Sequence, residues 1–183
     1  MLLTMARHVC VFCGSRGGSR PAYVQAARAV GAALGRRRLG VVFGGGRIGL
    51  MGAVADAALE AGCHVTGVIP HALVGRELAH RGLTELRVVN SMHERKALMA
   101  DLSDAFLALR GGYGAREEFC EALTRSQLGI HRKPCGLLNV DGYYDDLLRL
   151  FDRGVAEGFI RPEHRGMVLC GDEAGSLIDR LLS

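Results

Sequence analysis

Short apolar runs alternate with longer amphipathic segments along the whole chain, and this alternation limits the possible folds more than any other feature. Strands and helices in such alternation form βαβ units in a mostly parallel sheet. The runs are apolar at nearly every position, as expected for strands covered on both faces. We therefore predict an α/β fold, a Rossmann-like, doubly wound, mostly parallel sheet of about six or seven strands with helices on both faces. The length of 183 residues favours a single domain over residues 1–183.

Local signals give the expected elements. We expect strands over residues 8–13, 41–43, 64–69, 86–89, 105–109, 134–139 and 167–170. We expect helices over residues 21–38, 49–61, 92–102, 115–129 and 143–157, and a last helix that Asp172 caps. Pro70 should end the third strand, and Ser91 with Glu94 has the spacing of a capping box. The run Arg36-Arg37-Arg38 falls at a helix end, where cations suit the helix dipole.

Composition excludes several classes of protein. Hydrophobic residues make up 49% of the chain and charged residues 23%, as in an ordinary globular protein and unlike a disordered one. The formal net charge of +4 is too small to predict a nucleic-acid partner, although an anionic small molecule is compatible with it. The N-terminal apolar stretch is too short for a signal peptide, and no run approaches the ~20 apolar residues of a membrane span. We therefore expect a cytoplasmic protein without a membrane partner.

The six cysteines are scattered through apolar surroundings, where free cysteine packs as a small hydrophobe. Cys10 and Cys13 have the CxxC spacing, but no second pair follows at the distance of a zinc site. Both also fall inside the first expected strand, whereas a thioredoxin-type motif opens a helix. We therefore expect core packing here and predict no metal site.

Three glycine-rich loops, over residues 14–18, 44–49 and 111–114, follow expected strands. In doubly wound sheets, ligands bind beyond the carboxyl ends of the strands. Gly44-x-Gly46-x-x-Gly49 fits the dinucleotide fingerprint, but the acidic residue expected about 20 positions later is missing. An NAD(P) site and simple tight packing of a helix on a strand both stay open for this loop. The phosphate-binding P-loop motif is not found in the sequence.

The loop at 111–114 is the stronger candidate for binding an anion. It joins an expected buried strand to a helix N-terminus, where free amides and the helix dipole favour negative charge. Glu117 and Glu118 follow in the first turn, and the preceding helix begins with His93-Glu94-Arg95-Lys96. Each group also has a simpler interpretation: the acids could compensate the helix dipole, and the basic residues could form a solvated helix face.

Taken in order, these pieces resemble one family. The motifs are Val11-Phe12-Cys13-Gly14-Ser15, then Gly44-Gly45-Gly46 with Gly49-Leu50-Met51-Gly52, then Ser91-Met92-His93-Glu94-Arg95-Lys96, and Gly111-Gly112-Tyr113-Gly114 with Glu117-Glu118. They are similar to those of the LOG ("lonely guy") proteins, cytokinin riboside 5′-monophosphate phosphoribohydrolases that are often labelled lysine decarboxylases. The likeness covers nearly the whole chain.

The resemblance implies a Rossmann-like homodimer with active sites near the subunit interface. It implies hydrolysis, without a cofactor, of the N-glycosidic bond of a nucleoside 5′-monophosphate such as AMP or isopentenyladenosine monophosphate. The products would be the free base and ribose 5-phosphate. The catalytic Arg and Glu of the family fall on Arg95 and Glu118. The candidate substrate-binding residues are Gly14, Ser15, Gly45, Gly46, Glu77, Met92, Lys96, Gly111, Gly112, Tyr113, Gly114, Ala115, Arg116, Glu117 and Thr124.

The chain departs from the family pattern PGGxGTxxE at two positions, with Arg110 in place of Pro and Ala115 in place of Thr. Loss of a Thr cap would cost roughly 1 kcal/mol. We therefore expect a weaker grip on phosphate or a shifted substrate preference, unless Arg110 or Arg116 supplies charge instead. An alternative function follows: a nucleotide-binding member of the family with weakened catalysis. Lysine decarboxylation is disfavoured, because a pyridoxal-phosphate enzyme needs a Schiff-base lysine and the chain has only Lys96 and Lys133.

Overall fold

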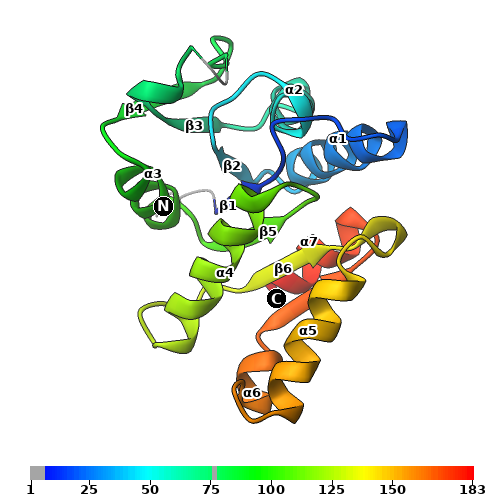
Figure 1. Cartoon of the computed structure of the whole chain (residues 1–183). Coiled ribbons are helices and arrows are strands. Elements are labelled where there is room, and N and C mark those ends of the chain that lie inside the picture. Colours follow the sequence, from blue (N-terminus) through cyan, green and yellow to red (C-terminus); the bar gives the residue numbers. More distant parts are fainter. Residues whose placement is uncertain (1–6, 76–77) are drawn as a thin grey trace, which may run out of the picture.

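The computed structural model describes residues 7–75 and 78–183. Its centre is one parallel sheet with the strand order β4-β3-β2-β1-β5-β6-β7 (Figure 1). The strands are β1 (His8–Phe12), β2 (Gly40–Phe43), β3 (Val65–Pro70), β4 (Glu85–Val89), β5 (Ala105–Ala108), β6 (Cys135–Leu138) and β7 (Val168–Gly171). The predicted α/β fold and its parallel sheet are confirmed.

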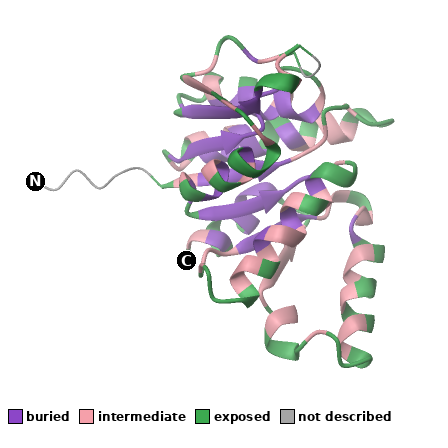
Figure 2. Cartoon of the chain, turned by 60° about the vertical axis from the view of Figure 1, so that its left-hand side comes forward, coloured by how far each residue is buried: buried purple, intermediate pink, exposed green. Residues whose placement is uncertain are grey.

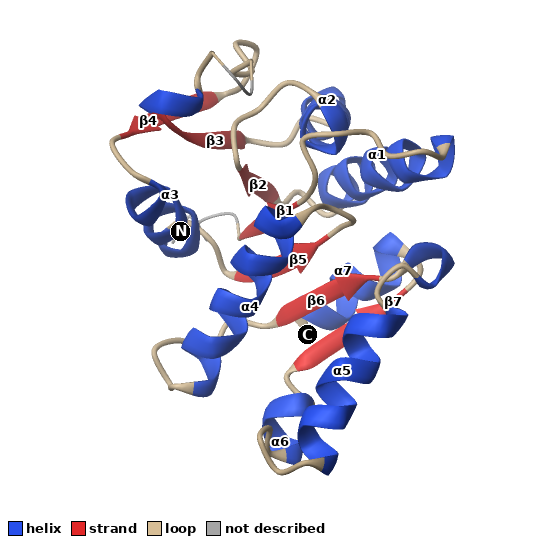
Figure 3. Ribbon diagram, in the orientation of Figure 1, coloured by secondary structure: helices blue, strands red, loops and turns tan. Residues whose placement is uncertain are grey.

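Helices cover both faces of the sheet (Figure 3). The main ones are α1 (Pro21–Arg36), α2 (Gly49–Glu60), α3 (Met92–Asp101), α4 (Tyr113–Gln127), α5 (Asp145–Ala156) and α7 (Ala174–Leu182). Helices α1, α2 and α7 share one buried cluster with the sheet, while α3 and α4 share the other. Residues 7–75 and 78–183 also include a short helix α6 (Pro162–Arg165) and two single 3₁₀ turns, η1 (His71–Leu73) and η2 (Val140–Gly142). Among the described residues, no helix combines the length and the apolar character that a membrane crossing needs.

Strand β1 shows why the strands read as solid apolar runs. Val9 and Val11 pack toward one cluster, whereas Cys10 and Phe12 pack toward the other. Because successive side chains point to opposite faces, a strand covered on both sides needs apolar residues throughout. Figure 2 shows the resulting buried layer running through the middle of the molecule.

The order in which the chain adds strands reverses at β1, which pairs with β2 on one side and with β5 on the other. Chain connections run outward from β1 to β4 on one side and from β5 to β7 on the other. The loops after β1 and β5 therefore separate at the carboxyl edge. This is the position where doubly wound sheets bind ligands.

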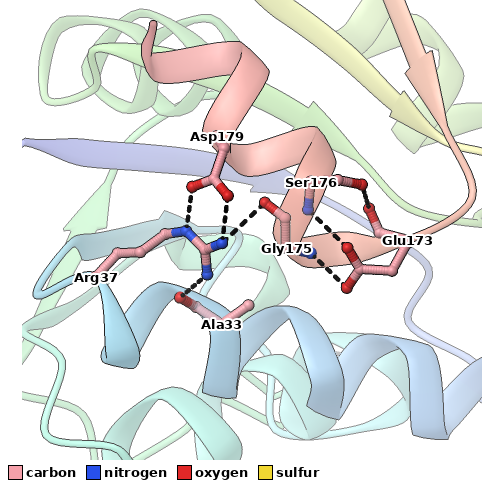
Figure 4. Close-up of polar contacts among 6 residues, drawn as sticks. All are labelled: Ala33, Arg37, Glu173, Gly175, Ser176 and Asp179. Carbon is pink, nitrogen blue, oxygen red and sulfur yellow. Dashed lines mark hydrogen bonds and ion pairs between the residues drawn. The ribbon is translucent and has the colours of Figure 1, made fainter.

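Figure 4 shows how the last helix is fixed to the first. Arg37, just beyond α1, donates from Nε and Nη2 to the two carboxylate oxygens of Asp179 at 2.6 and 2.7 Å. Its other bonds go to the carbonyls of Ala33 and Gly175, each at 3.0 Å. The basic run thus makes a specific contact between helices, which its sequence position alone did not reveal.

Several predicted boundaries were wrong. Glu173, not Asp172, caps α7, because its carboxylate accepts from the amides of Gly175 and Ser176. Pro70 is the last residue of β3 and not a residue beyond it. Cys13 lies one residue after β1. Helix α1 ends at Arg36 rather than 38, α4 begins at Tyr113 rather than 115, and α5 begins at Asp145 rather than 143. The predicted cap of α3 is confirmed, since the Glu94 amide donates to Ser91 Oγ at 3.1 Å.

Candidate active site

A cavity of about 320 Å³ opens at the carboxyl edge of the sheet, beside the ends of β1 and β2 and the first turns of α3 and α4. It brings together many of the predicted residues from segments far apart in the sequence. Those lining it are Gly14, Ser15, Met92, Arg95, Gly112, Tyr113, Gly114, Ala115, Glu117 and Glu118. Both predicted catalytic residues therefore share one cavity.

Arg95 is fixed in place beneath this cavity. Its side chain is buried, and the guanidinium donates to two backbone carbonyls, from Nε to Val68 at 3.0 Å and from Nη2 to Gly44 at 2.6 Å. A Cβ atom at Gly44 would lie 2.2 Å from Arg95 Nη2, so only glycine leaves room for this arrangement. One role of the glycine run after β2 is thus to seat an arginine.

Glu118, half-buried on α4, lies close to the end of β1. Burial is the largest cause that raises the pKa of the Cys13 thiol, and the negative charge of Glu118 raises it further. The positive charge of Arg95 lowers the same pKa. The two charges therefore both act on the Cys13 thiol, and both side chains line the cavity. This gives the site a carboxylate and a guanidinium, of which the guanidinium is held by bonds to the backbone.

The N-terminus of α4 offers backbone amides to the cavity. Gly112 is its N-cap, and no side chain caps the helix. The N-terminus of α2 differs, because the amides of Leu50 and Met51 both donate to the carbonyl of Gly14. An uncapped helix start attracts an anion through its amides and dipole. Of these two helix ends, α4 is the one suited to hold a phosphate.

Lys96 does not line the cavity and instead pairs with two acids of α4. Its ammonium lies 2.5 Å from a carboxylate oxygen of Glu117 and 2.5 Å from one of Glu121. Hydrogen bonds to these two acids, Glu117 first, raise the lysine pKa. The ion pairs connect α3 to α4 and engage the Glu117 carboxylate.

The remaining candidates within the described residues do not line this cavity. Gly45 and Gly46 are buried in the loop below it, and Gly111 lines a neighbouring cavity. Arg116 donates to the Tyr143 hydroxyl at 2.8 Å. Thr124 donates to the Cys120 carbonyl at 2.8 Å and lines an apolar groove between α4 and α5. Glu77 falls outside the described residues.

Ala115 and Arg110, the two residues that depart from the family pattern, lie in different structural surroundings. Ala115 is the third residue of α4 and buried, so the expected loss of an N-cap does not apply at this position. Arg110 is also buried, with its guanidinium 4.2 Å from the centre of the Tyr23 ring. It faces the neighbouring cavity rather than the one that holds Glu118.

Sequence reasoning missed five lining residues: Val11, Cys13, Gly44, Met51 and Leu73. Cys13 could have been found from its place directly after a central strand, whereas Leu73 comes from a 3₁₀ turn without a clear sequence signal. Over residues 7–75 and 78–183, no group of three or more His, Cys, Asp or Glu side chains is arranged to hold a metal ion. All six cysteines are free thiols.

Comparisons with known proteins show which family the chain is similar to. A family model described as "Possible lysine decarboxylase" matches residues 51–181. A probable cytokinin riboside 5′-monophosphate phosphoribohydrolase, LOGL9, of Oryza sativa subsp. japonica is 54% identical over 96% of this chain and 77% of its own length. LOG7 of Arabidopsis thaliana, a cytokinin riboside 5′-monophosphate phosphoribohydrolase, is 50% identical over 96% of this chain and 81% of its own length.

Among solved structures, the molybdenum cofactor carrier protein of Chlamydomonas reinhardtii superposes with a TM-score of 0.73. It covers 97% of this chain and 98% of its own, and at 21% identity it shows a shared fold only. The sequence relatives are much closer. On their identity and coverage, the chain belongs to the family of LOG phosphoribohydrolases.

Proposed function

We propose that this chain hydrolyses the N-glycosidic bond of nucleoside 5′-monophosphates such as AMP or isopentenyladenosine monophosphate, within one domain spanning residues 1–183. The products are the free base and ribose 5-phosphate. One observation carries the proposal: Arg95 and Glu118 line the same cavity as the uncapped start of α4. The names of relatives at about half identity support the same reaction class.

The site supplies what this bond cleavage requires. Departure of the base leaves oxocarbenium character on the ribose, which a nearby carboxylate stabilises while it orients or deprotonates water. Glu118 fills that role. Arg95 brings a positive charge to the same cavity. Because Nε and Nη2 donate to the Val68 and Gly44 carbonyls, that charge is held in place.

The spacing along α4 separates the two ends of the substrate. Glu118 lies about 9 Å along the helix axis from Gly112, at 1.5 Å per residue. A 5′-phosphate at the amides of Gly112 to Gly114 and a carboxylate at Glu118 are then far enough apart for the ribose to lie between them. Their mutual repulsion is reduced accordingly.

The test is release of base from AMP and from isopentenyladenosine monophosphate, separated by HPLC, with wild type and Glu118→Gln. We expect wild type to cleave at least one nucleotide and Glu118→Gln to lose this activity, since the amide can neither accept a proton nor carry charge. Glu163→Gln, which neutralises an exposed acid on α6 far from the cavity, is the matched control. It should retain activity.

Two results contradict the proposal. Cleavage by Glu118→Gln at the wild-type rate would remove Glu118 from the chemistry. If wild type cleaves neither nucleotide, while AMP still raises its melting temperature, the chain is instead a nucleotide-binding member of its family with weakened catalysis.

We also propose a homodimer in the cytoplasm. The groove between α4 and α5 is lined largely by apolar side chains, including Leu123, Phe151 and Ile160, and Phe159 beside it is 87% exposed. A second copy would cover this surface, and light scattering after size-exclusion chromatography gives the mass directly. The six free cysteines suit a reducing compartment.

A further inference from the structure

The side chain of Arg110 is buried and has donor atoms without a hydrogen-bond partner among the described residues. The residue follows β5 by two residues, its side chain is only 5% exposed, and neither Nε nor Nη2 has a hydrogen-bond partner among the described residues. A buried charged group without hydrogen bonds is costly, and such groups in folded proteins usually meet a water or an ion. The guanidinium therefore has two donor atoms available for a bound ligand.

The neighbouring side chains orient the guanidinium but do not satisfy it. Its carbon lies 4.2 Å from the ring centre of Tyr23 and 5.6 Å from that of Tyr143. Stacked rings hold the plane of an arginine and accept no in-plane hydrogen bonds, so they leave its edge free. The Tyr143 hydroxyl is already engaged, because it donates to the Gly111 carbonyl at 2.6 Å.

The local charge is positive. The nearest carboxylate is that of Asp141, at 3.8 Å from Arg110 Nη2, which is beyond hydrogen-bond distance. Asp141 is half exposed and is shared with Arg20, whose Nη1 lies 3.7 Å from the same oxygen. Arg16 lines the same cavity as Arg110. Two guanidinium groups thus lie near one carboxylate, and a third lines the same cavity, which leaves an excess of positive charge.

The space in front of Arg110 is large enough for a ligand group. A cavity of about 380 Å³ is lined by the loop after β1, including Gly14, Ser15 and Arg16, and by Arg110 and Gly112. Gly14, Ser15 and Gly112 also line the cavity that holds Glu118, so the two cavities adjoin. A Cβ at Gly112 would meet nothing within 4 Å, so that this backbone is open on one side.

We infer that Arg110, in a cavity that Arg16 also lines, forms an anion subsite that takes a phosphoryl group. A planar guanidinium with two available donors fits two phosphoryl oxygens, and the cavity adjoins the proposed catalytic cavity. The phosphoryl group is either the 5′-phosphate of the nucleotide or inorganic phosphate; the first source rests on the proposed function. Arg110 then strengthens the hold on phosphate, which is the alternative that the sequence left open for this position.

The test measures binding without turnover. Calorimetry with inorganic phosphate, ribose 5-phosphate and ribose compares wild type with Arg110→Gln and Arg110→Lys. Removing a charged pair of hydrogen bonds should weaken ribose 5-phosphate binding roughly 10- to 100-fold in Arg110→Gln, with a smaller loss in Arg110→Lys. Arg153→Gln, which removes the same charge from an exposed site on α5, controls for net charge and should bind as wild type does.

The ligands separate the two sources of phosphate. Weaker binding of both inorganic phosphate and ribose 5-phosphate supports a subsite for the free anion. Weaker binding of ribose 5-phosphate alone, with inorganic phosphate not bound by wild type, assigns the subsite to the sugar phosphate. Equal affinity of wild type and Arg110→Gln for every ligand overturns the inference. Because no ligand here is cleaved, a failure of AMP hydrolysis leaves this result intact.

A stability measurement excludes a purely structural role. If Arg110 serves a ligand, Arg110→Met should melt no lower than wild type in phosphate-free buffer, because it removes a buried charge whose Nε and Nη2 donors are unsatisfied. Added phosphate should then raise the melting temperature of wild type and not that of Arg110→Met. A large drop for Arg110→Met without phosphate, together with no effect of phosphate on wild type, would show that Arg110 only supports the fold.

Discussion

Gly44→Ala tests whether the glycine run after β2 exists to seat Arg95. The added methyl carbon would lie 2.2 Å from Arg95 Nη2, against the 3.4–4 Å of ordinary contact. Met51 Sδ, at 3.2 Å, is flexible and can give way. The guanidinium must therefore move by more than an ångström, and its 2.6 Å hydrogen bond to the Gly44 carbonyl is lost.

The expected effect is larger on activity than on stability. A lost hydrogen bond of a charged buried group costs about 1.5–3 kcal/mol. For a chain of this size, that lowers the melting temperature by about 3–12 °C. A displacement of about 1 Å in a catalytic group can reduce the rate ~100-fold. We therefore expect a folded protein whose kcat/KM for AMP falls by roughly two orders of magnitude.

The assay combines steady-state base release with thermal unfolding of the same preparation. Gly75→Ala is the matched control, because a Cβ at Gly75 would meet nothing within 4 Å and its backbone has no positive φ. It should keep both activity and melting temperature. If Gly44→Ala folds and is as active as Gly75→Ala, the position of Arg95 does not matter for the reaction and the reasoning is refuted.

Three further predictions concern stability and reactivity. Hydrogen bonding to Arg37 lowers the pKa of Asp179, so this contact stabilises the fold above about pH 4 and is lost as the pH falls. Arg37→Gln should therefore lower the melting temperature at about pH 7 more than at about pH 3. An equal drop at both pH values would contradict this prediction. Tyr144→Phe leaves the buried Leu109 carbonyl without the hydroxyl that now donates to it. Urea unfolding should therefore show that the free energy of unfolding falls by about 1–3 kcal/mol. An unchanged free energy of unfolding would mean that the carbonyl finds another donor. Burial raises the pKa of Cys135 to about 12, so iodoacetamide should leave this thiol unmodified in the native protein near pH 8 and modify it in urea, as peptide mass spectrometry would report.

Much of the fold could be predicted from the sequence, because buried parallel strands leave a strong signal. Val41-Val42-Phe43 and the run at 105–108 are apolar at every position, and both proved to be central strands. Element ends were less accurate. Asp172 and Glu173 are both acidic and adjacent, and only the backbone geometry decides which one reaches the amides of Gly175 and Ser176.

The candidate site was predictable in part for a different reason. Arg95 and Glu118 come from motifs at the ends of neighbouring elements, where the fold itself brings them together. The direction of a long side chain is not encoded in such spacing. Lys96 follows Arg95 directly, yet it turns to Glu117 and Glu121 because these acids share one face of α4.

The position of β1 between β2 and β5 has a consequence for synthesis of the chain. Val9 pairs with Val41 early, but its second neighbour, Ala105, is made much later. Until then, one edge of the central strand stays open to non-native pairing, the kind of exposure that makes folding slow and prone to aggregation. The cavity is completed only when β5 and α4 arrive. A nascent chain that stops short of them carries Arg95 without Glu118, so that this cavity cannot form until α4 has been made.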